Sequence, residues 1–215
     1  FEVFQRINRV TPVTAPALVT LALLGVRDRA LTLAEVCGLV TPLLEYAAAR
    51  ELPISHLGEL DHEDGVRQTL DALKAGGVVT AYDGGLEAVY AIEAGQHGVA
   101  AYYRNSAIHW FVNRAILEVA LLDVSHEDVA DPLERAWASA FALRDLLKFE
   151  FFFSDKATYR EEQKAESRLL HPEFRQHAVT VAQRRSVLRE APFLIAHRVL
   201  TPFLEAYYIV ADRLA

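Results

Sequence analysis

Two histidine–aspartate pairs are the residues whose types and spacing could support catalysis. His56 precedes Asp61 by five positions, and His126 precedes Asp131 by the same number. In such a pair the histidine can take a proton from an alcohol while the carboxylate orients the imidazole. The repeated spacing favours coincidence, because Asp131 reads better as a helix cap and the acidic run at 61–64 would repel an anionic substrate. We therefore expect no catalytic residue in this chain.

The segment 102–109, Tyr-Tyr-Arg-Asn-Ser-Ala-Ile-His, carries the most distinctive polar pattern in the sequence. Asn105, His109 and Asn113 are four residues apart, so they would share one face of a near-continuous helix over 102–123. Because buried polar groups are normally paired, this pattern favours a hydrogen-bonded structural seam between helices, with a ligand or interdomain contact as the alternative. The candidate contact residues are Tyr103, Arg104, Asn105, His109 and Asn113.

Other charged and aromatic residues favour packing over chemistry. Arg114 and Glu118 read as an ordinary ion pair on a helix, which contributes little stability. The phenylalanines within 149–153 could seat a helix end on a membrane, but core packing is the favoured interpretation. His171 and His177 share no helical face, and the sequence contains no His-Glu-x-x-His motif, phosphate-binding glycine loop or nucleophile elbow. We expect no metal site and no cofactor.

The first part of the chain predicts three helices followed by a β-hairpin. A capping box, Thr32-x-x-Glu35, opens the second helix, and Pro42 is expected to bend or break it. The double glycine at 76–77 ends the third helix, and Asp83-Gly84-Gly85 is a strong hairpin turn. This order resembles a winged-helix module. The predicted elements are helices over about 14–25, 32–50 and 66–75 and a hairpin over about 78–92.

The rest of the sequence predicts long helices. Asp131, Pro132 and Glu134 supply an N-cap, a first-turn proline and a capping acid. The charged stretch 156–168 has little apolar surface and is expected to be an exposed helix or loop. Further helices are predicted over about 131–153, 173–190 and 192–214. The fold class is therefore mainly α, with a helical, hairpin-containing subdomain over 1–95 and a long-helix bundle over 96–215, forming one compact unit.

Charge and composition exclude several classes of function. The chain has 22 basic and 29 acidic residues, a net charge of −7, and is 52% hydrophobic. Residues 51–93, where a winged helix would contact DNA, hold nine acidic residues against only Arg67 and Lys74, so we expect no nucleic-acid partner. A single cysteine, Cys37, fits a reducing compartment. No uncharged apolar run reaches the roughly 18 residues of a spanning helix, so any membrane contact is expected at the surface.

Several segments together resemble one enzyme family. Residues 6–14, Arg-Ile-Asn-Arg-Val-Thr-Pro-Val-Thr, are followed by Ala-Leu-Val at 17–19 and by Tyr-Tyr-Arg-Asn-Ser-Ala-Ile-His at 102–109. With the segments 146–152 and 203–207, their order and spacing resemble the C-terminal portion of bacterial membrane-bound glycerol-3-phosphate 1-O-acyltransferases. The resemblance covers nearly the whole chain, and the Tyr-Tyr-Arg-Asn segment is its most specific part.

The resemblance implies a place in phospholipid synthesis. That family transfers an acyl group from acyl-CoA or acyl-carrier protein to the 1-hydroxyl of glycerol 3-phosphate at the cytoplasmic face of the membrane. Its catalytic motifs, a His-x-Ser-x-x-Asp motif and a Pro-Glu-Gly-x-Arg-Ser motif, are absent here, and the segment 55–61 does not fit the first. Since the chain starts at Phe1 and contains no methionine, we expect it to be a fragment of a longer protein. Because the motifs are absent, we expect the fragment to be soluble, inactive alone and packed on an upstream catalytic domain of the full-length protein. The alternative is a noncatalytic helical module that binds a partner or a membrane surface.

Overall fold

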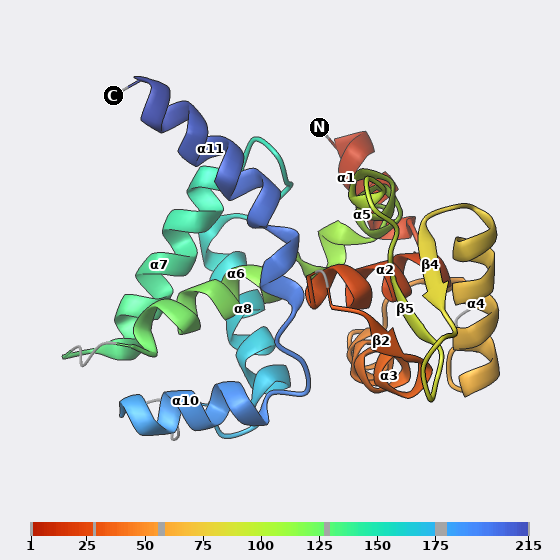
Figure 1. Cartoon of the computed structure of the whole chain (residues 1–215). Coiled ribbons are helices and arrows are strands. Elements are labelled where there is room, and N and C mark those ends of the chain that lie inside the picture. The colour runs from red at the N-terminus through yellow and green to blue at the C-terminus, as the bar shows by residue number, and fades with distance from the viewer. Residues whose placement is uncertain (1, 28, 56–58, 127–129, 175–179, 215) are drawn as a thin grey trace. The chain divides into compact units, whose positions relative to one another are not determined.

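The computed structural model describes residues 2–27, 29–55, 59–126, 130–174 and 180–214. The chain is mainly helical, as expected (Figure 1). It separates into two compact units, Phe1–Trp110 and Phe111–Ala215, and each is treated by itself below. The organisation expected from the sequence, with a boundary at 95/96 and a single compact unit, stays a prediction.

The first unit has the element order of a winged helix. The helices α2, α3 and α4 are followed by the antiparallel strands β4 and β5, and the short strand β2 completes a sheet of order β2-β5-β4 beside α4 (Figure 1). This confirms the predicted three helices and hairpin. The elements are α1 (Glu2–Val10), β1 (Val13–Thr14), α2 (Ala15–Gly25), β2 (Leu31–Thr32), α3 (Leu33–Ala49), β3 (Ile54–Ser55), α4 (Glu63–Ala75), β4 (Val79–Tyr82), β5 (Val89–Ile92) and α5 (His97–Asn105).

Helix α2 forms the centre of this unit. Its N-cap, the side chain of Thr14, accepts a hydrogen bond from the amide of Ala17, and Pro16 occupies the first turn. Most of its side chains are buried, including Leu18 at 0% exposure. The hydroxyl of Thr20, also buried, donates to the carbonyl of Pro16 over 2.7 Å. An almost entirely apolar helix is stable here because it is packed on nearly every side.

The capping residues of α3 and α4 confirm the sequence signals. In α3 the hydroxyl of Thr32 accepts from the amide of Glu35, and the Glu35 carboxylate accepts from the amide of Thr32. The expectation that Pro42 breaks this helix is wrong: α3 runs through it, because buried side chains on both sides of the proline hold the helix in the core. Helix α4 ends at the double glycine, where Gly77 adopts a φ of +71° that other residues rarely tolerate.

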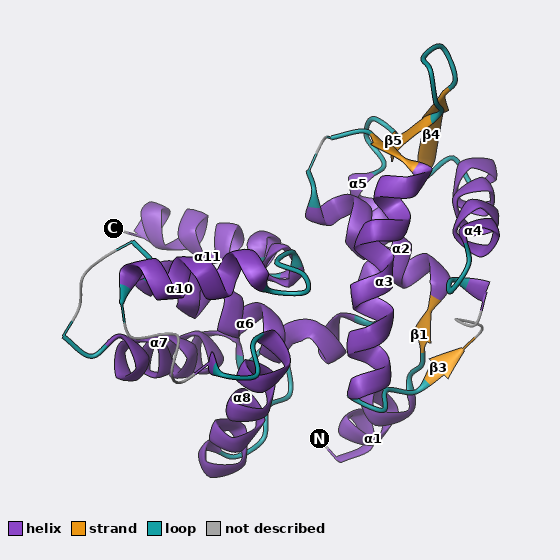
Figure 2. Cartoon of the chain, turned by 90° about the horizontal axis from the view of Figure 1, so that it is seen from below, coloured by secondary structure: helices purple, strands orange, loops and turns teal. Residues whose placement is uncertain are grey.

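Two short pairings in this unit have no sequence signal. Strands β1 and β3 pair in parallel, with Val13 opposite Ile54, and lie side by side in Figure 2. Strand β2 pairs with β5, with Leu31 opposite Tyr90. Each of these strands has only two residues, which is too short for alternating polarity to show. Their positions come from the packing of the helices around them.

The described part of the second unit is built from α-helices of about three to five turns and one short 3-10 helix. These are α6 (Ile108–Val124, whose first turn belongs to the first unit), α7 (Pro132–Leu147), α8 (Lys156–Leu170), α10 (Val181–Glu190), the short 3-10 helix η2 (Ala196–Val199) and α11 (Thr201–Leu214). The Asp131 side chain accepts from the amide of Glu134 over 3.0 Å, which confirms the predicted start of α7.

Several boundaries predicted here are wrong. Helix α7 ends at Leu147 rather than near 153, and the last segment forms η2 and α11 rather than one helix from 192. The helix expected over 173–190 is described only as α10, from Val181 to Glu190, because residues 175–179 lie outside the described residues. The stretch 156–168, expected to be exposed, forms α8 with a buried face. Its buried residues are Tyr159, Gln163, Glu166, Ser167 and Leu170. Most of the side chains on that face are polar, so the number of apolar residues in the sequence did not indicate that the face is buried.

Candidate functional site

Asn105, His109 and Asn113, expected to share one helix face, do not all lie on the same helix. Helix α5 ends at Asn105 and α6 begins at Ile108, so the near-continuous helix expected over 102–123 is divided into two helices at residues 106–107. At the break, the hydroxyl of Ser106 donates to the carbonyl of Tyr103 over 2.7 Å. This gives a hydrogen-bond partner to one of the carbonyl groups in the last turn of α5. Asn105 therefore lies on a different helix from His109 and Asn113. The polar contacts of these three residues are made in different parts of the structure.

Arg104 and Asn105 form a local pair at the end of α5. The Nε and Nη2 groups of Arg104 donate to the side-chain oxygen of Asn105 over 3.1 and 2.9 Å. Arg104 is only 5% exposed, and burial lowers the pKa of its guanidinium from the usual value. Among the described residues it contacts no carboxylate, although buried cations are normally paired with an opposite charge. Its neighbour Tyr103 is partly exposed at the same helix end.

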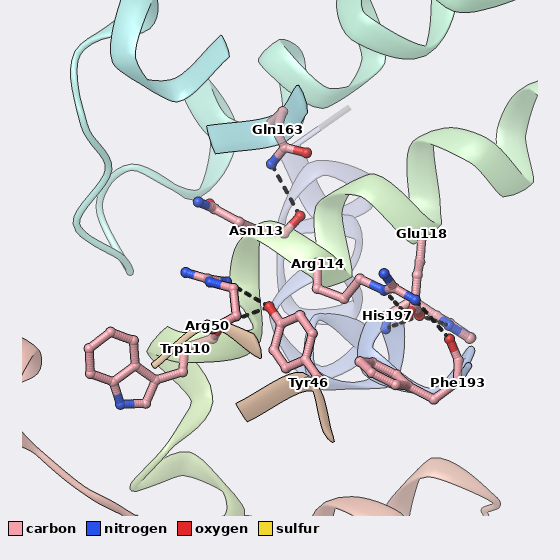
Figure 3. Close-up of polar contacts among 9 residues, drawn as sticks. All are labelled: Tyr46, Arg50, Trp110, Asn113, Arg114, Glu118, Gln163, Phe193 and His197. Carbon is pink, nitrogen blue, oxygen red and sulfur yellow. Dashed lines mark hydrogen bonds and ion pairs between the residues drawn. The ribbon is translucent and has the colours of Figure 1, made fainter. Parts of the chain in front are cut away.

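His109 and Trp110 hold helix α1 on the first unit. The Nε2 of His109 donates to the carbonyl of Asn8 over 2.8 Å, and the indole nitrogen of Trp110 donates to the carbonyl of Thr11 over 3.0 Å. In Figure 3 the Trp110 backbone lies near Tyr46, whose hydroxyl donates to the Trp110 carbonyl over 3.4 Å. His109 thus makes an inter-element contact within its own unit. Burial lowers its pKa, and the bond to Asn8 opposes this only in part.

The lowered pKa of His109 predicts that this unit loses stability in acid. Because the folded state binds a proton less readily than the unfolded chain, stability is greatest above the unfolded pKa of about 6.5 and falls as the pH drops below it. Thermal unfolding from pH 8 to 5 should therefore show a steeper decrease in Tm for the wild type than for His109→Gln. Glutamine can still donate to Asn8 but does not titrate. Equal pH profiles for the two proteins would contradict this role of His109.

In the second unit, Asn113 lies in a polar seam between α6 and α8. Its carbonyl accepts from Gln163 over 3.1 Å (Figure 3). The side-chain nitrogen of Asn113 donates to Glu162 over 3.1 Å. Gln163 also donates to the hydroxyl of Tyr159, and Ser154 donates to Glu162 over 2.6 Å. Burial raises the pKa of Tyr159, so its phenol stays neutral. This seam accounts for the buried polar face of α8.

A buried charged cluster joins α6 to the segment before α11, and sequence reasoning missed it. Arg114 and Glu118 form the expected ion pair on a helix, over 3.1 Å, but neither side chain has any exposed surface, so the pair is not an ordinary one. The second carboxylate oxygen of Glu118 accepts from the amide and the Nδ1 of His197, each over 2.9 Å. Arg114 also donates to the carbonyl of Phe193 over 3.1 Å, and its guanidinium lies 4.5 Å from the centre of that ring (Figure 3).

The contacts of this cluster hold α6 against the segment before α11. Both oxygens of Glu118 accept hydrogen bonds from other parts of the second unit. One guanidinium nitrogen of Arg114, Nη1, is buried without a hydrogen-bond partner. The sequence signal that could have found the cluster is Arg-x-x-x-Glu within a helix that is otherwise strongly apolar. His197 and Phe193, about 80 residues further on, carry no such signal.

The remaining sequence candidates are placed as follows. His56 and His177 lie outside the described residues, and Asp61 is exposed in a turn. Within the part of the chain that is described, no group of three or more potential ligands could hold a metal ion. Of the phenylalanines at 149–153, Phe151 and Phe153 pack against other rings, whereas Phe149 is 83% exposed. The favoured core interpretation therefore holds for only part of that segment.

Fold and polar contacts together define a mainly helical region with a winged-helix-like first unit and buried polar clusters that hold helices to one another. The chain belongs to the family described as the glycerol-3-phosphate acyltransferase C-terminal region, whose family model matches residues 1–215. This confirms the resemblance seen in the sequence.

The chain is also similar to curated proteins that are named as putative acyltransferases. The chain is 45% identical over 217 residues to "Putative acyltransferase plsB1" of Mycobacterium bovis and to the protein of the same name in two Mycobacterium tuberculosis strains. Each match covers 100% of this chain but only 35% of the relative, so the chain spans about a third of their length. None of the described helices is both long and apolar enough to span a membrane.

Proposed function

We propose that this chain is the accessory C-terminal region of a glycerol-3-phosphate acyltransferase. The full-length protein would transfer an acyl group from acyl-CoA or acyl-carrier protein to the 1-hydroxyl of glycerol 3-phosphate, at the cytoplasmic face of the cell membrane. The observation that carries the proposal is the family match along the entire chain, combined with its coverage of only 35% of relatives named as acyltransferases. The catalytic groups then belong to a domain upstream of this region in the same polypeptide.

Acyl transfer measured in parallel on two proteins tests this proposal. The chain of residues 1–215 should transfer no acyl group from a long-chain acyl-CoA to glycerol 3-phosphate, and the same chain joined to its natural upstream sequence should be active. Activity of the short chain would contradict the assignment of the chemistry to the upstream part. Inactivity of both proteins towards glycerol 3-phosphate, with either acyl donor, would contradict the proposed reaction.

Arg104 is the residue of this region that best fits a contact with the upstream domain. Its guanidinium is buried, is held in one orientation by Asn105, and contacts no carboxylate among the described residues. A carboxylate supplied by the upstream domain would complete the charge pair, and bidentate pairing with arginine is both strong and directional. Tyr103 and Asn105, which flank Arg104, would border the same contact.

The substitution Arg104→Gln should have opposite effects on the short and the full-length protein. In the chain of residues 1–215 it removes a buried charge that lacks a counter-charge, so Tm should stay unchanged or rise. In the full-length protein it leaves the upstream carboxylate unpaired, so kcat/KM should fall about tenfold or more. Arg67→Gln, at an exposed arginine, is the matched control. A decrease in Tm of the short chain, in step with lost activity, would show that Arg104 acts only within this region.

A further inference from the structure

Helix α11 leaves large apolar side chains in contact with solvent. None of its described residues is buried. Tyr208, Ile209, Val210 and Leu214 are 73%, 59%, 56% and 82% exposed, and we call these four residues the C-terminal patch. An apolar helix in a protein normally buries such residues, and tertiary packing supplies most of a helix's stability. The described residues of the second unit therefore leave the patch without a cover.

The first half of α11 is attached to its own unit. The Phe203 ring packs edge-on against Phe151, with centroids 5.0 Å apart, and the hydroxyl of Tyr207 donates to Glu150 over 3.0 Å. These contacts fix the direction of the helix beside the segment that carries the exposed Phe149 (Figure 1). The C-terminal patch follows Tyr207 in the chain, lies beyond these contacts and is exposed.

Two residues of the patch, Tyr208 and Ile209, line a shallow hollow of a size that accepts a side chain. It has a volume of about 470 Å³ and is lined by Leu204, Glu205, Tyr208 and Ile209. Three of its four residues offer apolar or aromatic surface, and Glu205 adds a carboxylate. Interfaces between proteins commonly combine such an apolar centre with a charged rim. The hollow thus fits an apolar side chain with a basic group next to it.

Charge argues against an anionic membrane as the cover. Helix α11 carries Glu205 and Asp212 against one basic residue, Arg213, and Glu150 lies next to Tyr207. Surfaces that bind the cytoplasmic leaflet are instead rich in lysine and arginine, because that leaflet is negatively charged. Exposed apolar and aromatic side chains flanked by acidic groups are better suited to another protein surface.

The polypeptide itself supplies a candidate for that surface. Nearly two thirds of the length of the curated relatives lies outside the part that this chain matches. A surface tethered in the same chain is present at a high effective concentration, so even a modest apolar contact would be occupied. We propose that the C-terminal patch docks on an apolar surface of the upstream part of the same polypeptide, with a basic residue there opposite Glu205. This inference rests on the proposed function, because it requires that upstream part.

A nitroxide label at position 209 tests the docking. Ile209→Cys is introduced into a Cys37→Ser background in the full-length protein, which is reconstituted in vesicles of zwitterionic and anionic phospholipid, and also into the chain of residues 1–215. Collision rates of the label with oxygen, which concentrates in lipid, and with a water-soluble nickel chelate report what surrounds the side chain. Leu86→Cys, at a fully exposed hairpin residue, is the control for a label in water.

The three possible surroundings give different results. Docking predicts low collision rates with both reagents in the full-length protein, with nickel collisions about tenfold below those in the short chain, since interface centres exclude water. High oxygen with low nickel collisions would place the patch in lipid, and nickel collisions equal to those of the short chain would leave it uncovered. Either result overturns the proposal. Acyl transfer measured on the same labelled protein reports separately on the proposed reaction.

Discussion

Replacing Glu118 with alanine is expected to lower the free energy of unfolding of the second unit by about 3 to 5 kcal/mol. The loss is large because Arg114 would remain fully buried without its counter-charge, and the amide and imidazole of His197 would lose their shared acceptor. Urea unfolding of the chain of residues 1–215 checks this. In a Trp110→Phe background the fluorescence of Trp137, which lies on α7, reports on the second unit alone.

An exposed ion pair of the same spacing provides the control for Glu118. Arg67 and Glu63 are also four residues apart on one helix and form an ion pair over 2.6 Å, but their side chains are 47% and 61% exposed. Glu63→Ala should change the free energy of unfolding of the first unit, followed by Trp110 fluorescence in a Trp137→Phe background, by less than about 1 kcal/mol. Similar losses for Glu118→Ala and Glu63→Ala would show that burial does not set the strength of the pair.

Truncating Leu18 to alanine is expected to destabilise the first unit by about 2 to 5 kcal/mol. Leu18 is 0% exposed at the centre of α2, and the surrounding helices cannot fully close the space left by the missing carbon atoms. Trp110 fluorescence during urea unfolding, again without Trp137, provides the measurement. Leu86→Ala, at a side chain in solvent on the hairpin, should stay within about 0.5 kcal/mol of wild type. A loss under 1 kcal/mol at Leu18 would mean that the core repacks.

Features determined by neighbouring residues could be predicted from the sequence. The capping box of α3 needs only Thr32 and Glu35, and the hairpin needs only its turn and two short apolar runs. The burial of α2 agrees with its continuous apolar composition. By contrast, strands β1, β2 and β3 gain their partners through contacts between distant segments, and two residues cannot carry a periodic signal.

The polar contacts were harder to predict because burial depends on residues far away in the chain. The spacing of Arg114 and Glu118 is the same in a surface pair and in a buried one, and only His197 and Phe193, 79 residues beyond their partners, distinguish the two cases. The break between α5 and α6 was missed because neither glycine nor proline occurs at Ser106–Ala107. A side-chain hydrogen bond from Ser106 ends the helix instead.

Thr32 belongs to two elements at once, and this links their local opening. Its backbone pairs with Val89 of β5, while its hydroxyl and amide close the capping box of α3. Separating β2 from β5 therefore disturbs the first turn of α3, and fraying of that turn loosens the sheet edge. Local opening usually proceeds in such contiguous cooperative units. The amides of β2, β5 and the first turn of α3 should consequently exchange their hydrogens with solvent together, as a single foldon of the first unit.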